Sequence, residues 1–244
     1  MGGFSIIVIF VLGAAIGSFL NVVIYRIPEG KSIVTPASHC PHCHTPIKWY
    51  HNIPILSWII LGGKCAYCKA SIALQYPLVE LITALIFVLL YLKLGPVWHL
   101  PFVWASFSAL LALALIDFKY YAIPDSVNFF ALVTALIQPD LLHAALYALI
   151  AAAGLFILGK GVGYLFKKEA LGSADVIVAG TMAALLGFPD FFLALFIAAL
   201  LALLPALFAR DAIIPFVPFL ALATWIVYIY SEQSETLLNG LIYG

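Results

Sequence analysis

The chain of 244 residues is 65% hydrophobic, only 9% charged and formally neutral at pH 7. A soluble globular domain has about 25% charged residues, so this composition indicates a protein that lies in a lipid bilayer. Because basic residues are few and balanced by acids, nothing electrostatic favours a nucleic acid partner, and that class of function is excluded.

Eight apolar segments predict membrane-spanning helices, because roughly 20 mainly apolar residues are needed to cross a bilayer. The first is too long for a signal-peptide core and no small-residue cleavage site follows it, so we expect it to be retained. The fourth and sixth are short, and we expect them to be half-buried or tilted. In chain order the segments are about 4–25, 77–94, 97–116, 126–138, 141–159, 176–188, 191–209 and 213–230. The predicted fold class is therefore an all-α polytopic membrane protein with about eight transmembrane helices.

The basic residues predict the orientation of these spans, because short loops rich in Lys and Arg stay on the cytoplasmic side. Only Lys93 falls in a loop of the opposite set. The other ten are Arg26, Lys31, Lys48, Lys64, Lys69, Lys119, Lys160, Lys167, Lys168 and Arg210. We therefore expect both termini to lie outside and the loops near 117–125, 160–175 and 210 to face the cytoplasm.

The sizeable insertion after the first span, about 28–76, contains all four cysteines in two CxxC pairs, "CPHC" at 40–43 and "CAYC" at 65–68. Four thiolates satisfy a tetrahedral zinc ion and leave no open position. A cytoplasmic location disfavours disulfides. We expect Cys40, Cys43, Cys65 and Cys68 to bind structural zinc, which would stabilise a small domain with little core. A redox role and a site without metal remain open alternatives.

Four histidines crowd the same insertion and could replace a cysteine as a metal ligand. They are His39, His42, His44 and His51. With four thiolates available, the simpler interpretation places them on the surface.

Acidic residues at the edge of a membrane are costly and are therefore candidates for function. Asp117 ends the apolar run "ALLALALI", and Asp175 precedes the run "VIVAG". The topology places both at the cytoplasmic edge, where one could stay protonated while the other is ionised and activates a water molecule. The small residues "GSA" at 172–174 would let a substrate backbone approach. An ion or proton pathway would also use such acids, so this pattern alone leaves both possibilities open.

Two further acids have structural interpretations. Glu80 follows "YPLV" at the start of the second span, where it would favour the positive N-terminus of that helix. Asp125 follows Pro124 and is expected to be the N-cap of the fourth helix. Proline disfavours helical geometry at Ile123, so Asp117 and Asp125 should lie on either side of a helix break.

Taken together and in order, these motifs identify the sequence as similar to the bacterial type IV prepilin leader peptidases, which also serve type II secretion. The resemblance rests on "GSFLNVVIYRIP" at 17–28, "WYHNIPILSWIILGGKCAYC" at 49–68, "YPLVE" at 76–80, "LIDFKYYAIPD" at 115–125, "LGSADV" at 171–176 and "IPFVPFL" at 214–220, with the paired CxxC motifs. Asp175 falls in the place of the aspartate in a Gly-x-Gly-Asp signature of intramembrane aspartic proteases.

The resemblance implies that Asp117 and Asp175 are the catalytic pair of an aspartic endopeptidase in the bacterial inner membrane. Such enzymes cleave the basic leader of prepilins and pseudopilins at the cytoplasmic face, then methylate the new N-terminus with S-adenosylmethionine. The implied division is a first span at 1–27, a methyltransferase-associated zinc insertion at 28–76 and a peptidase bundle at 77–244. Asn21 and Arg26, at the end of the first span, are candidates for the methyl-donor site.

Three residues depart from the family pattern, and they bear on substrate fit or rate. Ala174 replaces the second glycine of the signature, Ile177 replaces a common lysine, and Val217 replaces the glycine of "IPFGPFL". An alternative function is a transporter or proton relay that uses the same acids. A zinc-dependent enzyme is disfavoured because four thiolates leave no position for water.

Overall fold

The computed structural model describes residues 3–166, 172–208 and 214–231, and this part of the chain is α-helical with no β-strand. Lys167, Lys168 and Arg210 lie outside the described residues. The chain forms two units, Met1–Gly95 and Pro96–Gly244. The predicted all-α fold class is confirmed.

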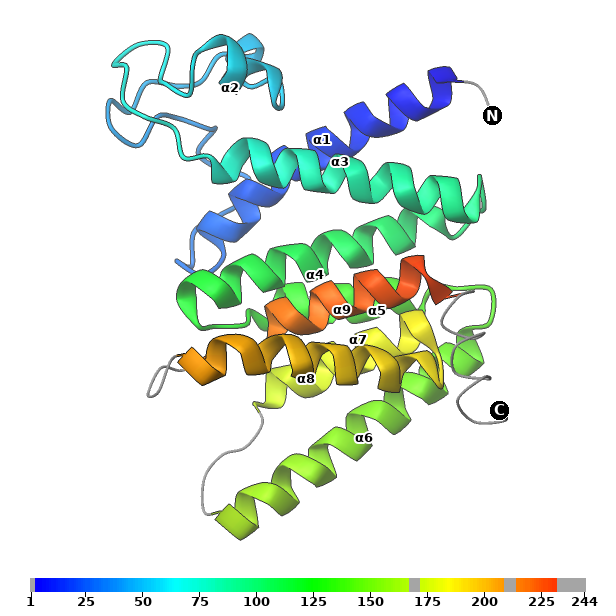
Figure 1. Ribbon diagram of the computed structural model, residues 1–244. Coiled ribbons are helices and arrows are strands. Elements are labelled where there is room, and N and C mark those ends of the chain that lie inside the picture. Colours follow the sequence, from blue (N-terminus) through cyan, green and yellow to red (C-terminus); the bar gives the residue numbers. More distant parts are fainter. Residues whose placement is uncertain (1–2, 167–171, 209–213, 232–244) are drawn as a thin grey trace. The chain divides into compact units, whose positions relative to one another are not determined.

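The first unit is built on two long helices, α1 (Gly3–Arg26) and α3 (Gln75–Leu94), which lie side by side (Figure 1). They run antiparallel, because Gly13 lies against Ala84 while Gly17 lies against Glu80. The connecting insertion has two short helical segments, η1 (Trp49–His51) and α2 (Leu56–Ile60). Its remaining described residues form turns and two isolated bridges rather than a hydrophobic core.

The second unit is a helical bundle in which α7 lies among its neighbours (Figure 1). Helix α4 packs on α5 and α9, and α7 packs on α5, α6 and α9. The facing sides are lined by small side chains such as Ala112 and Ala183, both fully buried, which allow close helix packing. The helices are α4 (Leu100–Tyr120), α5 (Asp125–Leu136), α6 (Leu141–Phe166), α7 (Ser173–Leu186), α8 (Asp190–Phe208) and α9 (Val217–Ile229).

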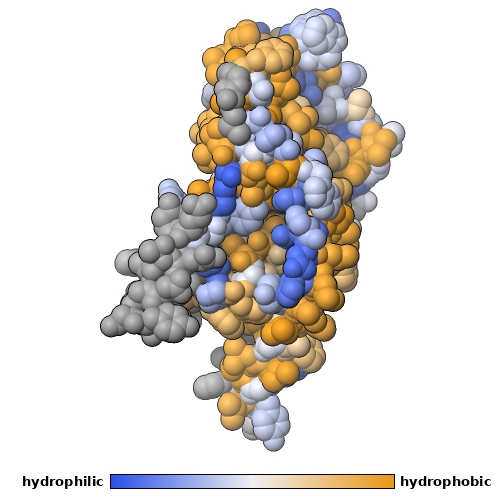
Figure 2. Space-filling model, turned by 90° about the vertical axis from the view of Figure 1, so that its right-hand side faces the viewer, coloured by the Kyte–Doolittle hydropathy of each residue, from blue (hydrophilic) through white to orange (hydrophobic). Residues whose placement is uncertain are grey.

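Five of the described helices, α1, α3, α4, α6 and α8, are long and apolar enough to cross a membrane. Helices α5, α7 and α9 are apolar but shorter. Together they account for the eight predicted segments, and the protein is a multi-pass membrane protein. Many large apolar side chains are exposed, and Figure 2 shows hydrophobic residues over much of one face with hydrophilic ones in narrow patches, as expected for a surface in contact with lipid.

The structure corrects three local predictions. Helix α4 continues to Tyr120, so Asp117 lies one turn before the helix end rather than at it. Helix α3 begins at Gln75, so Glu80 lies beyond the first turn, where the helix dipole has its effect. Helix α5 begins at Asp125 itself, with Pro124 as its N-cap and no side-chain cap hydrogen bond. The predicted break between Asp117 and Asp125 is confirmed.

Candidate active site

Asp117 is held in the last turn of α4 by a contact from a distant part of the chain. Its side chain is 7% exposed, and its Oδ2 accepts a hydrogen bond of 3.1 Å from the backbone N–H of Val217. Val217 is the first residue of α9, and helix N-termini offer free N–H groups that stabilise a carboxylate. The start of α9 therefore fixes the position of Asp117.

Asp175 lies in the first turn of α7, as the sequence predicted. Its Oδ2 accepts a hydrogen bond of 3.1 Å from the N–H of Gly172, and its own N–H donates to the Gly172 carbonyl at 3.2 Å. This reciprocal pair caps the helix in the manner of a capping box. A Cβ at position 172 would lie 3.1 Å from Oδ2, so glycine leaves room for the carboxylate.

The fold brings the two acids into one neighbourhood, although they are far apart in the sequence. Asp117 in α4 and Asp175 in α7 interact electrostatically. The packing of α9 on both α4 and α7 joins the two helices that carry these acids. Like charges that interact oppose the ionisation of both carboxylates at once.

Asn128 is a site residue that the sequence analysis did not identify. It lies on α5, is fully buried, and its Nδ2 donates a hydrogen bond of 2.9 Å to the carbonyl of Ala174. Its Oδ1 is buried without a hydrogen-bond partner in the structure. The only sequence signal was a polar side chain among apolar neighbours in "DSVNFFALV". Asn128 thus fixes the residue directly before Asp175.

The structure also shows how Val217 meets Asp117. The contact is made by the backbone N–H, which any residue except proline provides, while the valine side chain is fully buried. Replacing the usual glycine by valine therefore keeps the hydrogen bond. Ile177 and Ala174 are both partly buried in the first half of α7.

The four cysteines lie together in the first unit. Their sulfur atoms are all within 4.8 Å of one another, and the Sγ atoms of Cys40 and Cys68 are 3.7 Å apart. A tetrahedral site with Zn–S bonds of about 2.3 Å requires sulfur atoms roughly 3.8 Å apart. The tetrad therefore has the geometry and donor set to bind a metal ion.

The two CxxC motifs have the same backbone path. A bridge joins His39 to Pro46 around the first pair, and the equivalent bridge joins Lys64 to Ser71 around the second. The residue after each second cysteine has positive φ, +56° at His44 and +60° at Lys69. The insertion thus presents the same turn twice to one tetrad.

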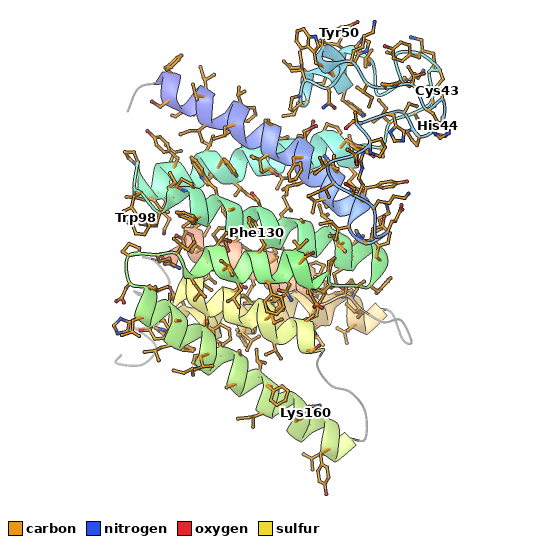
Figure 3. All side chains as sticks on the ribbon, turned by 180° about the vertical axis from the view of Figure 1, so that it is seen from behind. Cys43, His44, Tyr50, Trp98, Phe130 and Lys160 are labelled. Carbon is orange, nitrogen blue, oxygen red and sulfur yellow. The ribbon has the colours of Figure 1, made fainter. Side chains whose placement is uncertain are left out.

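Hydrogen bonds favour the thiolate, which is the metal-binding form of cysteine, at Cys43 and Cys65, whereas burial and the neighbouring thiols raise the pKa of Cys68 to about 11. The side chain and backbone of Thr45 lower the pKa of Cys43 to about 6. The backbone N–H groups of Cys68 and Tyr67 lower the pKa of Cys65. The four predicted alternative ligands, His39, His42, His44 and His51, lie outside the tetrad, and Figure 3 shows Cys43 and His44 in the looped part of the insertion.

The two candidates for the methyl-donor site differ in their surroundings. Arg26 is partly exposed and its Nη1 donates a hydrogen bond of 3.0 Å to the carbonyl of Ser32, so it closes the turn after α1. Asn21 is buried between α1 and α3, where its Nδ2 donates to the carbonyl of Tyr76 at 3.1 Å.

Comparison with known proteins gives matches over both units. Residues 11–94 match the bacterial peptidase A24 N-terminal domain, and residues 104–207 match the type IV leader peptidase family. A prepilin leader peptidase/N-methyltransferase of Pseudomonas aeruginosa is 32% identical over 91% of this chain and 89% of its own length. The chain belongs to the type IV leader peptidase family.

Other relatives in the type IV leader peptidase family have the same name. The protein of Myxococcus xanthus is 39% identical over 73% of this chain, and the chain spans 55% of that protein's length. The protein of Neisseria gonorrhoeae is 30% identical over 94% of this chain and 92% of its own length. No solved structure matches the chain significantly. Asp117 and Asp175 fall within the peptidase match, and the cysteines fall within the N-terminal match.

Proposed function

We propose that the protein is a membrane aspartic endopeptidase that removes the basic leader of prepilins and pseudopilins through Asp117 and Asp175. It also methylates the new N-terminus with S-adenosylmethionine. The enzyme works at the cytoplasmic face of the bacterial inner membrane, with both termini outside, and serves type IV pili and type II secretion. The observation that carries the proposal is that helix α9 packs on both α4 and α7, which brings two acids more than 50 residues apart in the sequence into one neighbourhood.

In the proposed peptide hydrolysis the two acids have different roles. The ionised carboxylate takes a proton from water, and the water oxygen bonds to the scissile carbonyl carbon. The protonated carboxyl donates its proton to the carbonyl oxygen. The resulting diol collapses when the peptide C–N bond breaks and the departing nitrogen gains a proton. The backbone N–H groups of Val217 and Gly172 keep the two carboxylates in place throughout.

The zinc insertion at 28–76 supports the methylating half of the function, while residues 77–244 form the proposed peptidase bundle. Cys40, Cys43, Cys65 and Cys68 would hold zinc in a closed site that joins the two turns of the insertion. S-adenosylmethionine supplies the methyl group when it is bound.

The alternative function, a transporter or proton relay, has less support. Transport acids form a series across the membrane. Asp117 and Asp175 instead lie near the ends of their helices, in the last turn of α4 and the first turn of α7. The family match also favours a peptidase.

The decisive experiment incubates the purified protein with a prepilin and S-adenosylmethionine and weighs the product by mass spectrometry. We expect loss of the leader and gain of one methyl group. An intact prepilin would refute the peptidase proposal, and a cleaved product without added methyl mass would refute the methylating half alone.

A further inference from the structure

Glu80 is a buried carboxylate that the proposed peptide hydrolysis does not use. It lies on α3, is 7% exposed, and takes part in no ion pair within the described residues. Its Oε2 accepts a hydrogen bond of 2.7 Å from the N–H of Ile55, and the side chain of Ser18 also bonds to it. Removing a carboxylate from water without a cationic partner is costly, so such a group in a native protein is a candidate for function.

Asn21 brings a second acceptor to the same place. It is 4% exposed, and its Nδ2 is bonded to the carbonyls of Gly17 at 3.3 Å and Tyr76 at 3.1 Å. Its Oδ1 is buried and has no hydrogen-bond partner among the described residues. A buried oxygen of this kind destabilises the protein unless something donates a hydrogen bond to it.

Asn21 and Glu80 lie at the same end of the helix pair. Tyr76 and Glu80 are one turn apart on α3, and Gly17 and Asn21 are one turn apart on the antiparallel α1. Because the Asn21 amide bonds to the carbonyls of Gly17 and Tyr76, and Gly17 lies against Glu80, both acceptors belong to the insertion end of the two helices.

A glycine makes this close approach possible. A Cβ at Gly17 would lie 2.6 Å from the Cα of Glu80 and 3.0 Å from the carbonyl of Val79, so no larger residue fits there. Among the described glycines of α1, Gly17 therefore makes a very close approach to α3, and it does so at the position of Glu80.

The insertion covers this place with a residue in an unusual conformation. Ile55 has φ +63° and ψ −54°, a region that β-branched residues rarely adopt. Its backbone N–H donates the hydrogen bond to the Glu80 carboxylate. An N–H donor of a ligand could replace the Ile55 N–H as the hydrogen-bond partner of Glu80. The backbone of Ile55 could then leave its unusual conformation.

We propose that Glu80 and Asn21 bind the α-ammonium group of the methyl acceptor and that Glu80 removes its proton before methylation. The ligand class follows from the chemistry of the pair: a carboxylate and a free amide oxygen both accept hydrogen bonds, so they select a cationic N–H donor. This assignment rests on the proposed methylating function.

The proposed step balances as follows. The Glu80 carboxylate takes one proton from the ammonium group, which leaves a neutral amine with a free electron pair. The amine nitrogen forms a bond to the methyl carbon of a sulfonium donor, and the carbon–sulfur bond breaks with its electron pair left on sulfur. The methylated nitrogen carries the positive charge, the donor becomes a neutral thioether, and Glu80 later releases its proton to water.

The test uses Glu80→Gln, which keeps an oxygen to accept the Ile55 N–H while removing the charge and the base. The substrate is a synthetic peptide that begins with the free amine of a cleaved pilin, so that no prior cleavage is needed. We expect methylation to fall by roughly 10²–10⁴-fold, while cleavage of an intact prepilin is unchanged. The matched control is Glu29→Gln, which removes an acid that pairs with Lys31 at the surface of the same unit.

A binding measurement without any methyl donor gives an independent readout. The wild-type protein should bind the free-amine peptide at least about 10-fold more tightly than its N-acetylated form, the range expected for hydrogen bonds to a charged group. Glu80→Gln and Asn21→Ala should reduce this preference.

Two results would overturn the inference: equal binding of the two peptides by the wild-type protein, or normal methylation by Glu80→Gln. If the wild-type protein methylates neither the free-amine peptide nor a cleaved prepilin, the proposed methylating function itself is wrong. This outcome differs from one in which the wild-type protein methylates and Glu80→Gln does so equally well.

Discussion

Glu80 in the first unit and Asp117 in the second are both deeply buried carboxylates, and they are alike in their hydrogen bonding. Glu80 in the first unit and Asp117 in the second are both 7% exposed, and each accepts one backbone N–H from a distant segment. Their neighbours differ, because Asp117 interacts with a second acid whereas the groups that interact with Glu80, the Ile55 N–H and the Ser18 side chain, are neutral. A pair of acids can share a proton around one water molecule, whereas a single acid among neutral groups can bind a cation and accept its proton.

The largest expected effect tests the paired half of this comparison. Asp117→Asn or Asp175→Asn should lower prepilin cleavage by roughly 10²–10⁴-fold or abolish it, because neither amide can exchange the proton that the pair shares. Leader removal is followed by mass spectrometry on membrane-inserted protein. The methylation of a peptide with a free N-terminus should remain.

The control for these variants is Asp140→Asn, since Asp140 is exposed, directly precedes α6 and pairs with His143 in the first turn of that helix. Full cleavage by either active-site variant would contradict the assignment of the pair.

The next largest effect concerns the cysteine tetrad of the first unit. It tests whether damage to that unit lowers methylation more than cleavage. Cys40→Ser removes one of the four thiolates. The affinity for the metal should therefore fall by more than the roughly 10–100-fold that is typical when a residue that only hydrogen-bonds to a metal ligand is lost. The insertion should become sensitive to proteolysis, and methylation should fall more than cleavage. Metal content is measured by elemental analysis.

His42→Ser is the matched control for Cys40→Ser, because His42 is adjacent to Cys43 but outside the tetrad. A Cys40→Ser protein that keeps one equivalent of zinc, or a His42→Ser protein that loses it, would show that the ligand set is wrong.

A moderate effect is expected from Asn128→Leu, which tests whether Asn128 positions Asp175. The loss of the hydrogen bond to the Ala174 carbonyl should shift Asp175 and lower kcat for cleavage by up to about 100-fold, with little change in KM. Thr134→Val removes a buried hydroxyl of α5 that donates a hydrogen bond within its own helix, and this variant should leave kcat unchanged. Equal kcat in both variants would limit Asn128 to a packing role.

The smallest effect is expected from Ala174→Gly, which restores the usual signature. Glycine within a helix costs about 1 kcal/mol relative to alanine, so thermal stability should fall slightly while the cleavage rate changes only a few-fold. A rate increase of about 10-fold or more, equivalent to about 1.4 kcal/mol in the barrier, would mean that the alanine methyl group obstructs the substrate.

The sequence predicted the features that depend on local composition. Apolar runs located the eight long helices to within about four residues, except that α6 continues to Phe166 rather than ending near 159, and the CxxC spacing predicted the cluster of four cysteines. The sequence also placed Asp175 at the start of its helix, although α7 begins at Ser173 rather than at 176.

The contacts made across the fold were not predictable from one sequence. The N–H of Val217 reaches Asp117 across 100 residues, and Asn128 reaches Ala174 from another helix. Such contacts depend on the register of packed helices, which a hydrophobic period does not specify. The sequence predicted Glu80 at the start of its helix, and this was wrong for a local reason. The residues "QYP" extend α3 upstream of the apolar run, so that the helix begins at Gln75.

The duplicated turn of the insertion has a consequence for protein engineering. The segments 39–46 and 64–71 have different sequences apart from their cysteines, yet they follow one backbone path and place the same unusual φ after the second cysteine. The sulfur atoms and the backbone, rather than the intervening side chains, therefore define this module. Exchanging the two segments within the chain, or placing glycine at both positive-φ positions, should preserve it as an interchangeable part for redesigned metal-binding domains.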